Sequence, residues 1–223
     1  MFDEISPTYD KLNHLMSGWQ DIKWRRKAIH VLSKLNDTYE FILDLAAGSG
    51  DLTEQLLKLS PRYLFSVDLS LEMLKINKFK VNDNKNILLK SDALNLPFQN
   101  NFLNLVGISF GVRNFEKLEN TIIEINRVLK NGGLFLTIEM FKNLKKSFFL
   151  RCFSFYFSKI VPKLGKILSK NQYAYSYLFQ SVDSFLSIEE YSNLLMKNGF
   201  EITYIKNNFL GVVNTIIARK IQR

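Results

Sequence analysis

Short apolar runs alternate along this chain with segments whose apolar residues recur every three or four positions. Five runs have the length of buried strands, at 41–45, 63–68, 86–90, 103–109 and 133–140. Three intervening segments have helical spacing, at 51–59, 70–80 and 116–130. Asn131-Gly132-Gly133 is typical of a helix end and turn. The alternation predicts an α/β fold of the Rossmann-like, doubly wound type, with helices on both faces of a parallel sheet.

The two ends of the chain complete this prediction. Residues 1–36 are expected to form a helical cap, broken at Ser17-Gly18-Trp19, that packs over the carboxyl ends of the strands. A helix over 187–198 ends at Gly199, and strands follow at 201–206 and 211–219. The short turn Asn207-Asn208 between them predicts an antiparallel pair at one sheet edge. The whole is a mostly parallel, seven-stranded sheet.

We interpret residues 1–223 as a single domain with four parts. These are the cap (1–36), a cofactor-binding core (37–140), a basic aromatic helical lid inserted after strand five (141–182), and a C-terminal helix with its strand pair (183–223). A hydrophobic content of 47% in 223 residues is enough for one core of this kind.

Composition excludes several classes of protein. The single cysteine, Cys152, allows no internal disulfide and no cysteine zinc cage, and we predict no metal site. No apolar run reaches the ~18–20 residues of a membrane span. The first residues, Met1-Phe2-Asp3-Glu4, lack the basic and apolar regions of a signal peptide. We therefore expect a cytoplasmic protein.

The loop after the first strand carries the first chemical signal. Asp44-x-Ala46-x-Gly48-x-Gly50 leads from a strand into a helix, and both glycines allow positive φ and close approach of a ligand. The nicotinamide and flavin fingerprint needs a third glycine, but Thr53 stands there. The pattern fits better the loop that binds S-adenosylmethionine, whose amino-acid end and sulfonium suit a nearby acid.

Polar residues at the ends of the next three strands strengthen this interpretation. Asp68 follows Gly48 by 20 residues, the spacing at which a carboxylate can accept both ribose hydroxyls. Asp68 could also cap the helix that begins near Ser70. Asp92 ends the third strand, where it would lie near the adenine amino group, and Ser109 ends the fourth.

Motifs along nearly the whole chain resemble those of the UbiE/MenG-type ubiquinone and menaquinone biosynthesis C-methyltransferases. They are Tyr9-Asp10-x-x-Asn13-x-x-x-Ser17, Trp24-Arg25, Leu43-Asp-Leu-Ala-x-Gly-Ser-Gly-Asp51, Leu96-Pro97-Phe98, Ser109-Phe-Gly-Val-Arg-Asn114, Arg127-Val-Leu-Lys-x-Gly-Gly133 and Tyr175-Ser-Tyr177-Leu178. The glycine loop is shared by all class I methyltransferases, whereas the Ser109–Asn114 and Tyr175–Leu178 runs are specific to this family. Ser49 stands where the family usually has threonine and keeps the hydroxyl.

The resemblance implies methyl transfer from S-adenosyl-L-methionine to a ring carbon of a demethylated isoprenoid quinol, in this case demethylmenaquinol to menaquinol. It assigns cofactor contacts to Ser49, Asp68, Asp92, Ala93 and Ser109, beside the loop residues Asp44, Gly48 and Gly50. For catalysis we expect Arg113 to stabilise a phenolate and Tyr9 and Tyr177 to frame the ring. Arg113 could instead form a structural pair with Glu139.

Charge adds a predicted partner. Residues 141–182 hold eight lysines and arginines and no acid, while the whole chain carries +9. Aromatic residues share this segment, so we expect it to contact an anionic membrane surface, on the inner face of the cytoplasmic membrane, and to pass the quinol tail.

Other readings of the sequence stay open. A basic aromatic patch also suits an RNA methyltransferase, although the proline motif of amino-group methylation is absent after strand four and we expect no nucleic acid. Methylation of a benzoquinol in ubiquinone synthesis and a non-catalytic scaffold are further alternatives. The sequence leaves the oligomeric state open, a homodimer included.

Overall fold

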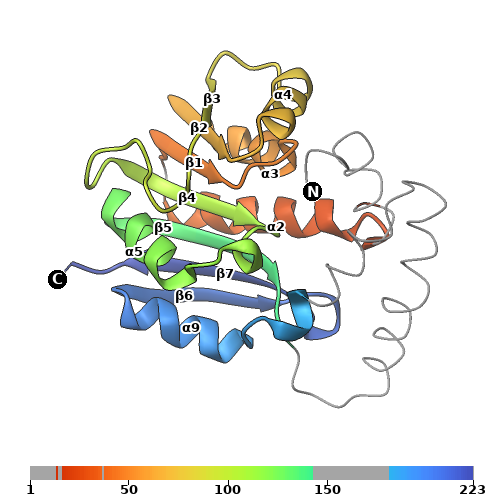
Figure 1. The fold of residues 1–223 in the computed structure, drawn as a ribbon, viewed down its shortest axis with the longest axis vertical. Coiled ribbons are helices and arrows are strands. Elements are labelled where there is room, and N and C mark those ends of the chain that lie inside the picture. The colour runs from red at the N-terminus through yellow and green to blue at the C-terminus, as the bar shows by residue number, and fades with distance from the viewer. Residues whose placement is uncertain (1–13, 15–16, 37, 143–180, 223) are drawn as a thin grey trace.

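The computed structural model describes residues 14, 17–36, 38–142 and 181–222 (Figure 1). It contains one sheet of order β3-β2-β1-β4-β5-β7-β6. The strands are β1 (Phe41–Leu45), β2 (Tyr63–Asp68), β3 (Asn86–Lys90), β4 (Leu103–Ser109), β5 (Leu129–Met140), β6 (Phe200–Asn207) and β7 (Val213–Lys220). Pairings are parallel from β3 to β5, and β7 is antiparallel to both its neighbours. The predicted seven-stranded, mostly parallel sheet is confirmed, with β6 at one edge.

Helices cover both faces of this sheet (Figure 1). One face carries α2 (Gln20–Leu35), α3 (Asp51–Leu56) and α4 (Leu71–Lys80), and the other carries α5 (Leu118–Val128) and α9 (Ile188–Lys197). Short 3₁₀ turns lie at Leu57–Leu59, Val112–Asn114 and Phe209–Gly211. The sheet order reverses between β1 and β4, and ligands of doubly wound proteins bind at that point, beyond the carboxyl ends of the strands.

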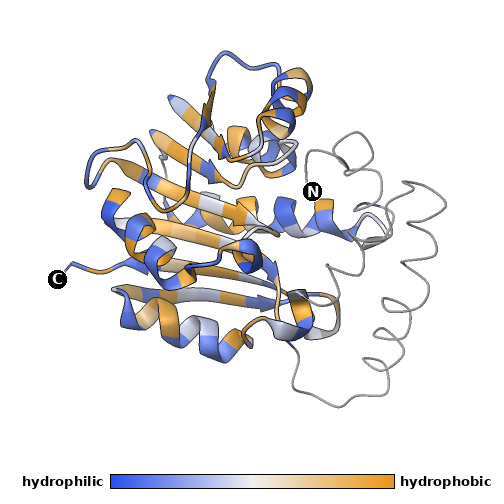
Figure 2. Cartoon of the chain, viewed as in Figure 1, coloured by the Kyte–Doolittle hydropathy of each residue, from blue (hydrophilic) through white to orange (hydrophobic). Residues whose placement is uncertain are grey.

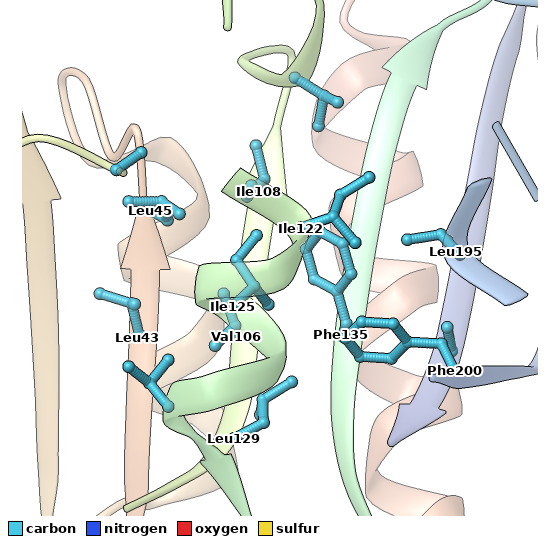
Figure 3. Close-up of a cluster of buried hydrophobic side chains, with 14 of the residues drawn as sticks. Leu43, Leu45, Val106, Ile108, Ile122, Ile125, Leu129, Phe135, Leu195 and Phe200 are labelled. Carbon is cyan, nitrogen blue, oxygen red and sulfur yellow. The ribbon is translucent and has the colours of Figure 1, made fainter. Parts of the chain in front are cut away.

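Strand residues alternate between two hydrophobic cores, one on each face. Ile42 belongs to the core that includes residues of α2 and α3, whereas its neighbour Leu43 belongs to the core that includes residues of α5 and α9. Figure 3 shows the second core, in which Ile122 and Ile125 of α5 meet the side chain of Phe135. Strands that are buried on both faces have continuous apolar runs in their sequence. Figure 2 shows the hydrophobic residues of these runs in orange through the centre of the sheet. That is why the sequence marked the strands so clearly.

The described part of the N-terminal segment, mainly residues 17–36, packs differently from the expected cap. The apolar stripe of α2, with Trp24, Ala28 and Leu32, is buried against the face of the sheet. Burial of this stripe against the strand side chains removes more apolar surface from water than a position over the strand ends would. The predicted break is present, because Gly18 and Trp19 have positive φ immediately before α2. Only the first turns of α2 reach the carboxyl ends of the strands, through Arg25.

The prediction of a helix end at Asn131-Gly132-Gly133 was wrong. Helix α5 ends at Val128, and residues 129–133 belong to β5. Leu103 pairs with Leu129 but Leu105 pairs with Leu134, so the extra residues form an irregularity in the ladder. Gly132 has a φ of 76°, and a Cβ on Gly133 would lie 2.8 Å from the carbonyl oxygen of Lys130. The glycines therefore mark a bulge within a strand.

The C-terminal elements follow the prediction closely. Ser187 caps α9 in a capping box with Glu190, and Gly199 follows the helix with a φ of 85°. The connection between β6 and β7 is longer than the predicted Asn207-Asn208 turn, because a 3₁₀ turn occupies Phe209–Gly211. Within the described ranges, no helix combines the length and apolar character needed to cross a bilayer.

Candidate active site

A pocket of about 230 Å³ lies beyond the carboxyl ends of β1, β2, β3 and β4. Seven of the eight predicted cofactor residues line it: Asp44, Gly48, Ser49, Asp68, Asp92, Ala93 and Ser109. The eighth, Gly50, is not part of the lining. Four strands that are distant in sequence thus bring these residues together, as expected for parallel strands whose carboxyl ends meet at one edge.

The glycine loop has the predicted left-handed conformation at both glycines. Gly48 has a φ of 54° and open space where a Cβ would be, so a ligand can approach its backbone closely. Gly50 has a φ of 93°, and a Cβ there would lie 2.9 Å from side-chain atoms of both Asn77 and Val81. Gly50 therefore serves the packing of α3 against α4, whereas Gly48 serves the pocket.

Asp44 is the buried acid of β1. Its Oδ2 accepts a 2.6 Å hydrogen bond from Thr53 Oγ1, and within the described part of the chain its buried Oδ1 has no hydrogen-bond partner. Burial raises the pKa of Asp44 to about 7, a rise that the Thr53 hydrogen bond and the charge of Arg25 reduce and the charge of Asp68 increases. A buried carboxylate oxygen beside a pocket fits a ligand that brings a positive charge or a hydrogen-bond donor.

A ring of buried polar side chains holds Thr53 in this orientation. Asn77 Nδ2 donates to Thr53 Oγ1 at 3.0 Å, and Thr53 Oγ1 also lies 3.2 Å from Ser66 Oγ. Ser66 in turn donates to Asn86, whose amide donates to Asn77. The threonine that made the dinucleotide fingerprint incomplete is therefore the donor that orients Asp44. Sequence reasoning missed this role, because none of these residues forms a motif with the others.

Both carboxylate oxygens of Asp68 accept hydrogen bonds from backbone N–H groups. Oδ2 accepts from Gly48 N and Oδ1 accepts from Ser70 N, each at 2.8 Å. The helix cap itself is Ser70, which accepts from Met73 N at 3.1 Å. Asp68 thus ties the glycine loop to the start of α4, and it also lines the pocket.

The remaining predicted contacts occupy the two ends of the pocket. Beyond β3, Asp92 Oδ1 accepts from Leu94 N at 3.0 Å and Ala93 is buried. Beyond β4, Ser109 Oγ accepts from Arg25 Nε at 3.2 Å. The order of the strands therefore separates Asp92 from Ser109 by the width of β2 and β1.

Arg25 is a lining residue that the sequence reasoning did not assign. It donates to Asp21 Oδ2 at 2.6 Å, lies 3.3 Å from Asp51 Oδ2, and places its guanidinium 5.5 Å from the centre of the Phe110 ring. Burial alone would raise the pKa of Asp21, but the hydrogen bond from Ser17 and the charge of Arg25 hold it below its ordinary value. The Trp24-Arg25 motif is the sequence feature from which a role of Arg25 in the site could have been predicted.

Of the three predicted catalytic residues, the structure describes Arg113. Arg113 forms a buried ion pair with Glu139 and also donates to the Phe110 carbonyl at 3.2 Å. The structural pairing that the sequence allowed is therefore present. Arg113 is not among the lining residues, and its role toward a substrate stays a prediction. The structure does not describe Tyr9 and Tyr177. Of the predicted lid, residues 143–180 also lie outside the described residues.

The sheet order, the glycine loop and the acids at the strand ends together define the class I S-adenosylmethionine-dependent methyltransferases. A Thermotoga maritima methyltransferase of this class aligns with a TM-score of 0.67 at 17% identity, covering 99% of this chain and 98% of that one. The ubiE/COQ5 methyltransferase family matches residues 1–220, and the chain belongs to this family.

Two curated relatives are similar over nearly their full length. One is the ubiquinone/menaquinone biosynthesis C-methyltransferase UbiE of Campylobacter jejuni, which is 36% identical over 99% of this chain and 96% of its own. The other is the demethylmenaquinone methyltransferase of Porphyromonas gingivalis, which is 34% identical over 99% of this chain and 91% of its own.

Proposed function

We propose that this protein methylates a ring carbon of a demethylated isoprenoid quinol with S-adenosylmethionine, converting demethylmenaquinol to menaquinol. The single observation that carries the proposal is the pocket at the switch point, in which Asp44, Asp68 and Asp92 converge from three strands. Both curated relatives have names that state this type of reaction.

The residues present fit the cofactor. Asp44 Oδ1, buried without a partner in the described part of the chain, would face the α-ammonium group. Asp68 would accept from the ribose hydroxyls, and Asp92 would lie at the adenine. The cofactor supplies an already activated methyl group, so the protein has only to orient the two partners, exclude water and favour the phenolate.

The substrate side rests on the predictions made from the sequence. Arg113 would favour the phenolate, directly or through water, and Tyr9 and Tyr177 would frame the ring. The basic segment 141–182 would bring the protein to anionic lipid and admit the tail. Flotation with neutral and anionic vesicles tests this last step, and equal binding to both would contradict it.

The reaction is tested with the full chain, S-adenosylmethionine and a short-tail demethylmenaquinol kept reduced. We expect a quinol product heavier by one methyl group in place of a hydrogen, and none from the oxidised quinone, whose ring carbon is not nucleophilic. A short-tail benzoquinol and unmodified tRNA are assayed in parallel. Methylation of the benzoquinol alone would move the substrate to ubiquinone synthesis, and methylation of tRNA alone would refute a quinol enzyme.

Asp68→Asn tests the cofactor site independently of the acceptor. The substitution removes a charged acceptor worth ~1.5–3 kcal/mol, so the affinity for S-adenosylmethionine should fall by roughly ten- to a hundredfold by calorimetry. The exposed acid Asp83, whose side chain accepts a hydrogen bond from Lys85 N, provides the control Asp83→Asn. Equal affinity of the two variants would contradict the assignment.

A further inference from the structure

A histidine and an acid form a pair just outside the lining of the pocket. His14 Nδ1 lies 2.8 Å from Asp21 Oδ2, and the Asp21 side chain is only 3% exposed. Asp21 also accepts from Ser17 Oγ at 2.6 Å and from Arg25 at 2.6 Å. Three neighbours therefore fix this carboxylate, and it in turn fixes the plane of the imidazole.

The pair determines which nitrogen of His14 carries a proton. Hydrogen bonds and the charge of Arg25 hold the pKa of Asp21 below its ordinary value, so its carboxylate is ionised and can only accept. Nδ1 must then donate to it. In the neutral ring this leaves the lone pair on Nε2.

The other ring nitrogen, Nε2, faces a residue of the pocket lining, although His14 is not itself a lining residue. Nε2 lies 3.8 Å from Asp51 Oδ2, which is too long for a hydrogen bond, and Asp51 is a lining residue. In the ranges that the structure describes, no hydrogen bond occupies Nε2. An imidazole with an oriented Nδ1–H and an accepting Nε2 has the form of a general base.

The position within the pocket also suits this role. If the adenine and ribose lie at Asp92 and Asp68, the methyl end lies toward β1 and β4, where Ser109 ends its strand. Arg25 bridges that end, since it donates to Ser109 and Asp21 and pairs with Asp51. His14 is thus on the side of the pocket where an acceptor must approach the methyl group.

We propose that His14 is the general base that removes the proton from the quinol hydroxyl, and that Asp21 is the residue that positions it. The inference deepens the proposed function and rests on it. The O–H bond breaks as Nε2 gains the proton, and the imidazolium is held by Asp21. The ring carbon then forms its bond to the methyl carbon while the bond to sulfur breaks and leaves its electron pair on sulfur. Loss of the ring C–H proton to water restores the aromatic ring as a phenolate, and the imidazolium returns its proton to that oxygen, so that one proton in total passes to solvent.

A divalent cation is the other ligand that these side chains suggest. Ligand atoms of His14, Asp21 and Asp51 lie within 4.8 Å of one another. However, the guanidinium of Arg25 already contacts both carboxylates, and Lys80 pairs with Asp51. These cations supply the positive charge that a metal ion would bring, so the geometry favours a base.

The test compares His14→Gln with His30→Gln, a control at the chain's other histidine, which is exposed on α2. Single-turnover methylation of the short-tail quinol is followed against pH at saturating S-adenosylmethionine, and cofactor affinity is measured by calorimetry. Among the described residues, Asp21 and Asp51 face His14, Arg25 contacts both acids and Lys80 pairs with Asp51, and all four are the same in both variants.

We expect His14→Gln to lose at least a hundredfold in rate, with the cofactor affinity within about threefold of the unaltered chain. The limb of the profile in which the rate rises with deprotonation of an imidazole should disappear, and added imidazole should partly restore His14→Ala. A merely structural role would move none of these pH and rescue readouts. Normal rate and profile in His14→Gln would overturn the role of His14 alone, as would a loss of rate that keeps the limb and resists imidazole. An unaltered chain that binds the cofactor yet methylates no quinol would overturn both proposals.

Discussion

Asp44→Asn separates the cost of the buried acid for folding from its value for binding. The substitution preserves shape and lets the new side-chain oxygen accept from Thr53 as Asp44 does at 2.6 Å. It removes a charge from a site that is 1% exposed. The variant should therefore fold more stably than the unaltered chain at neutral pH and bind S-adenosylmethionine far more weakly.

The magnitude follows from the shift in the pKa of Asp44 from 3.8 to about 7. When the pKa of an acid is higher in the folded than in the unfolded state, its neutral form favours folding. This contribution is fully present below the pKa of the unfolded state, and it is lost as the pH rises toward the pKa of the folded state. Relative to a neutral side chain, ionisation disfavours the folded state by ~2 kcal/mol at pH 5 and ~4 kcal/mol at pH 8. The free energy of unfolding should therefore fall by roughly 2–3 kcal/mol between these values, relative to Asp44→Asn.

Denaturant unfolding of the cofactor-free protein at several pH values measures this difference. Glu54→Gln, at an exposed acid on the same helix α3 that carries Thr53, controls for the loss of one negative charge. The unaltered chain and Glu54→Gln should lose stability in parallel as pH rises, and Asp44→Asn should not. Parallel curves for all three proteins would refute the argument that burial holds the pKa of Asp44 high.

Saturating S-adenosylmethionine should reverse the trend in the unaltered chain. The α-ammonium stays charged below pH ~7.5 and favours the ionised carboxylate, so the stabilisation by cofactor should grow between pH 5 and 7. Asp44→Asn should show a smaller and nearly constant stabilisation over that range. Equal cofactor affinity in the two proteins would show that Asp44 does not face the ligand.

Three further substitutions test the packing around the pocket. Gly50→Ala places a Cβ 2.9 Å from Asn77 and Val81 at a φ of 93°, so thermal unfolding should show a loss of ~2 kcal/mol or more. Gly48→Ala, with open space at its Cβ, should lose less stability but more cofactor affinity. Arg113→Met leaves the fully buried Glu139 without its partner and should cost ~3–5 kcal/mol, much of which Glu139→Gln in the same chain should restore.

Most of the fold could be predicted because its strands are buried on both faces. Each central strand shows a short apolar run, and helices such as α2 and α5 show one apolar stripe. The bulge in β5 could not be predicted this way, since Asn131-Gly132-Gly133 has the same residue types whether it ends a helix or interrupts a strand. Only the pairing of Leu103 with Leu129, across the sheet, distinguishes the two.

Some residues of the candidate site could likewise be predicted from the sequence, and others could not. Asp68 and Asp92 were found because strand ends in a parallel sheet converge, so spacing along the chain carries the information. The contacts of Asp21 and Arg25 were not found, because they depend on how α2 crosses the face of the sheet. The buried ring around Thr53 was missed for the same reason, since Asn77 meets Thr53 only where α4 packs beside α3, and Asn86 of β3 in turn bonds Asn77.

Strained backbone at the pocket gives the Arg113–Glu139 pair a physical purpose. Ala46 and Phe110 line the pocket with positive φ of 55° and 60°, values that cost a non-glycine residue ~1–3 kcal/mol unless neighbours fix them. Arg113 donates to the Phe110 carbonyl, and a Cβ on Gly111 would lie 2.8 Å from that of Ala46. The buried pair therefore anchors the turn after β4, and Gly111 lets that turn close against the loop after β1. The family-specific run from Ser109 to Asn114 thus holds the two sides of the pocket at a fixed separation, whatever Arg113 does for the substrate.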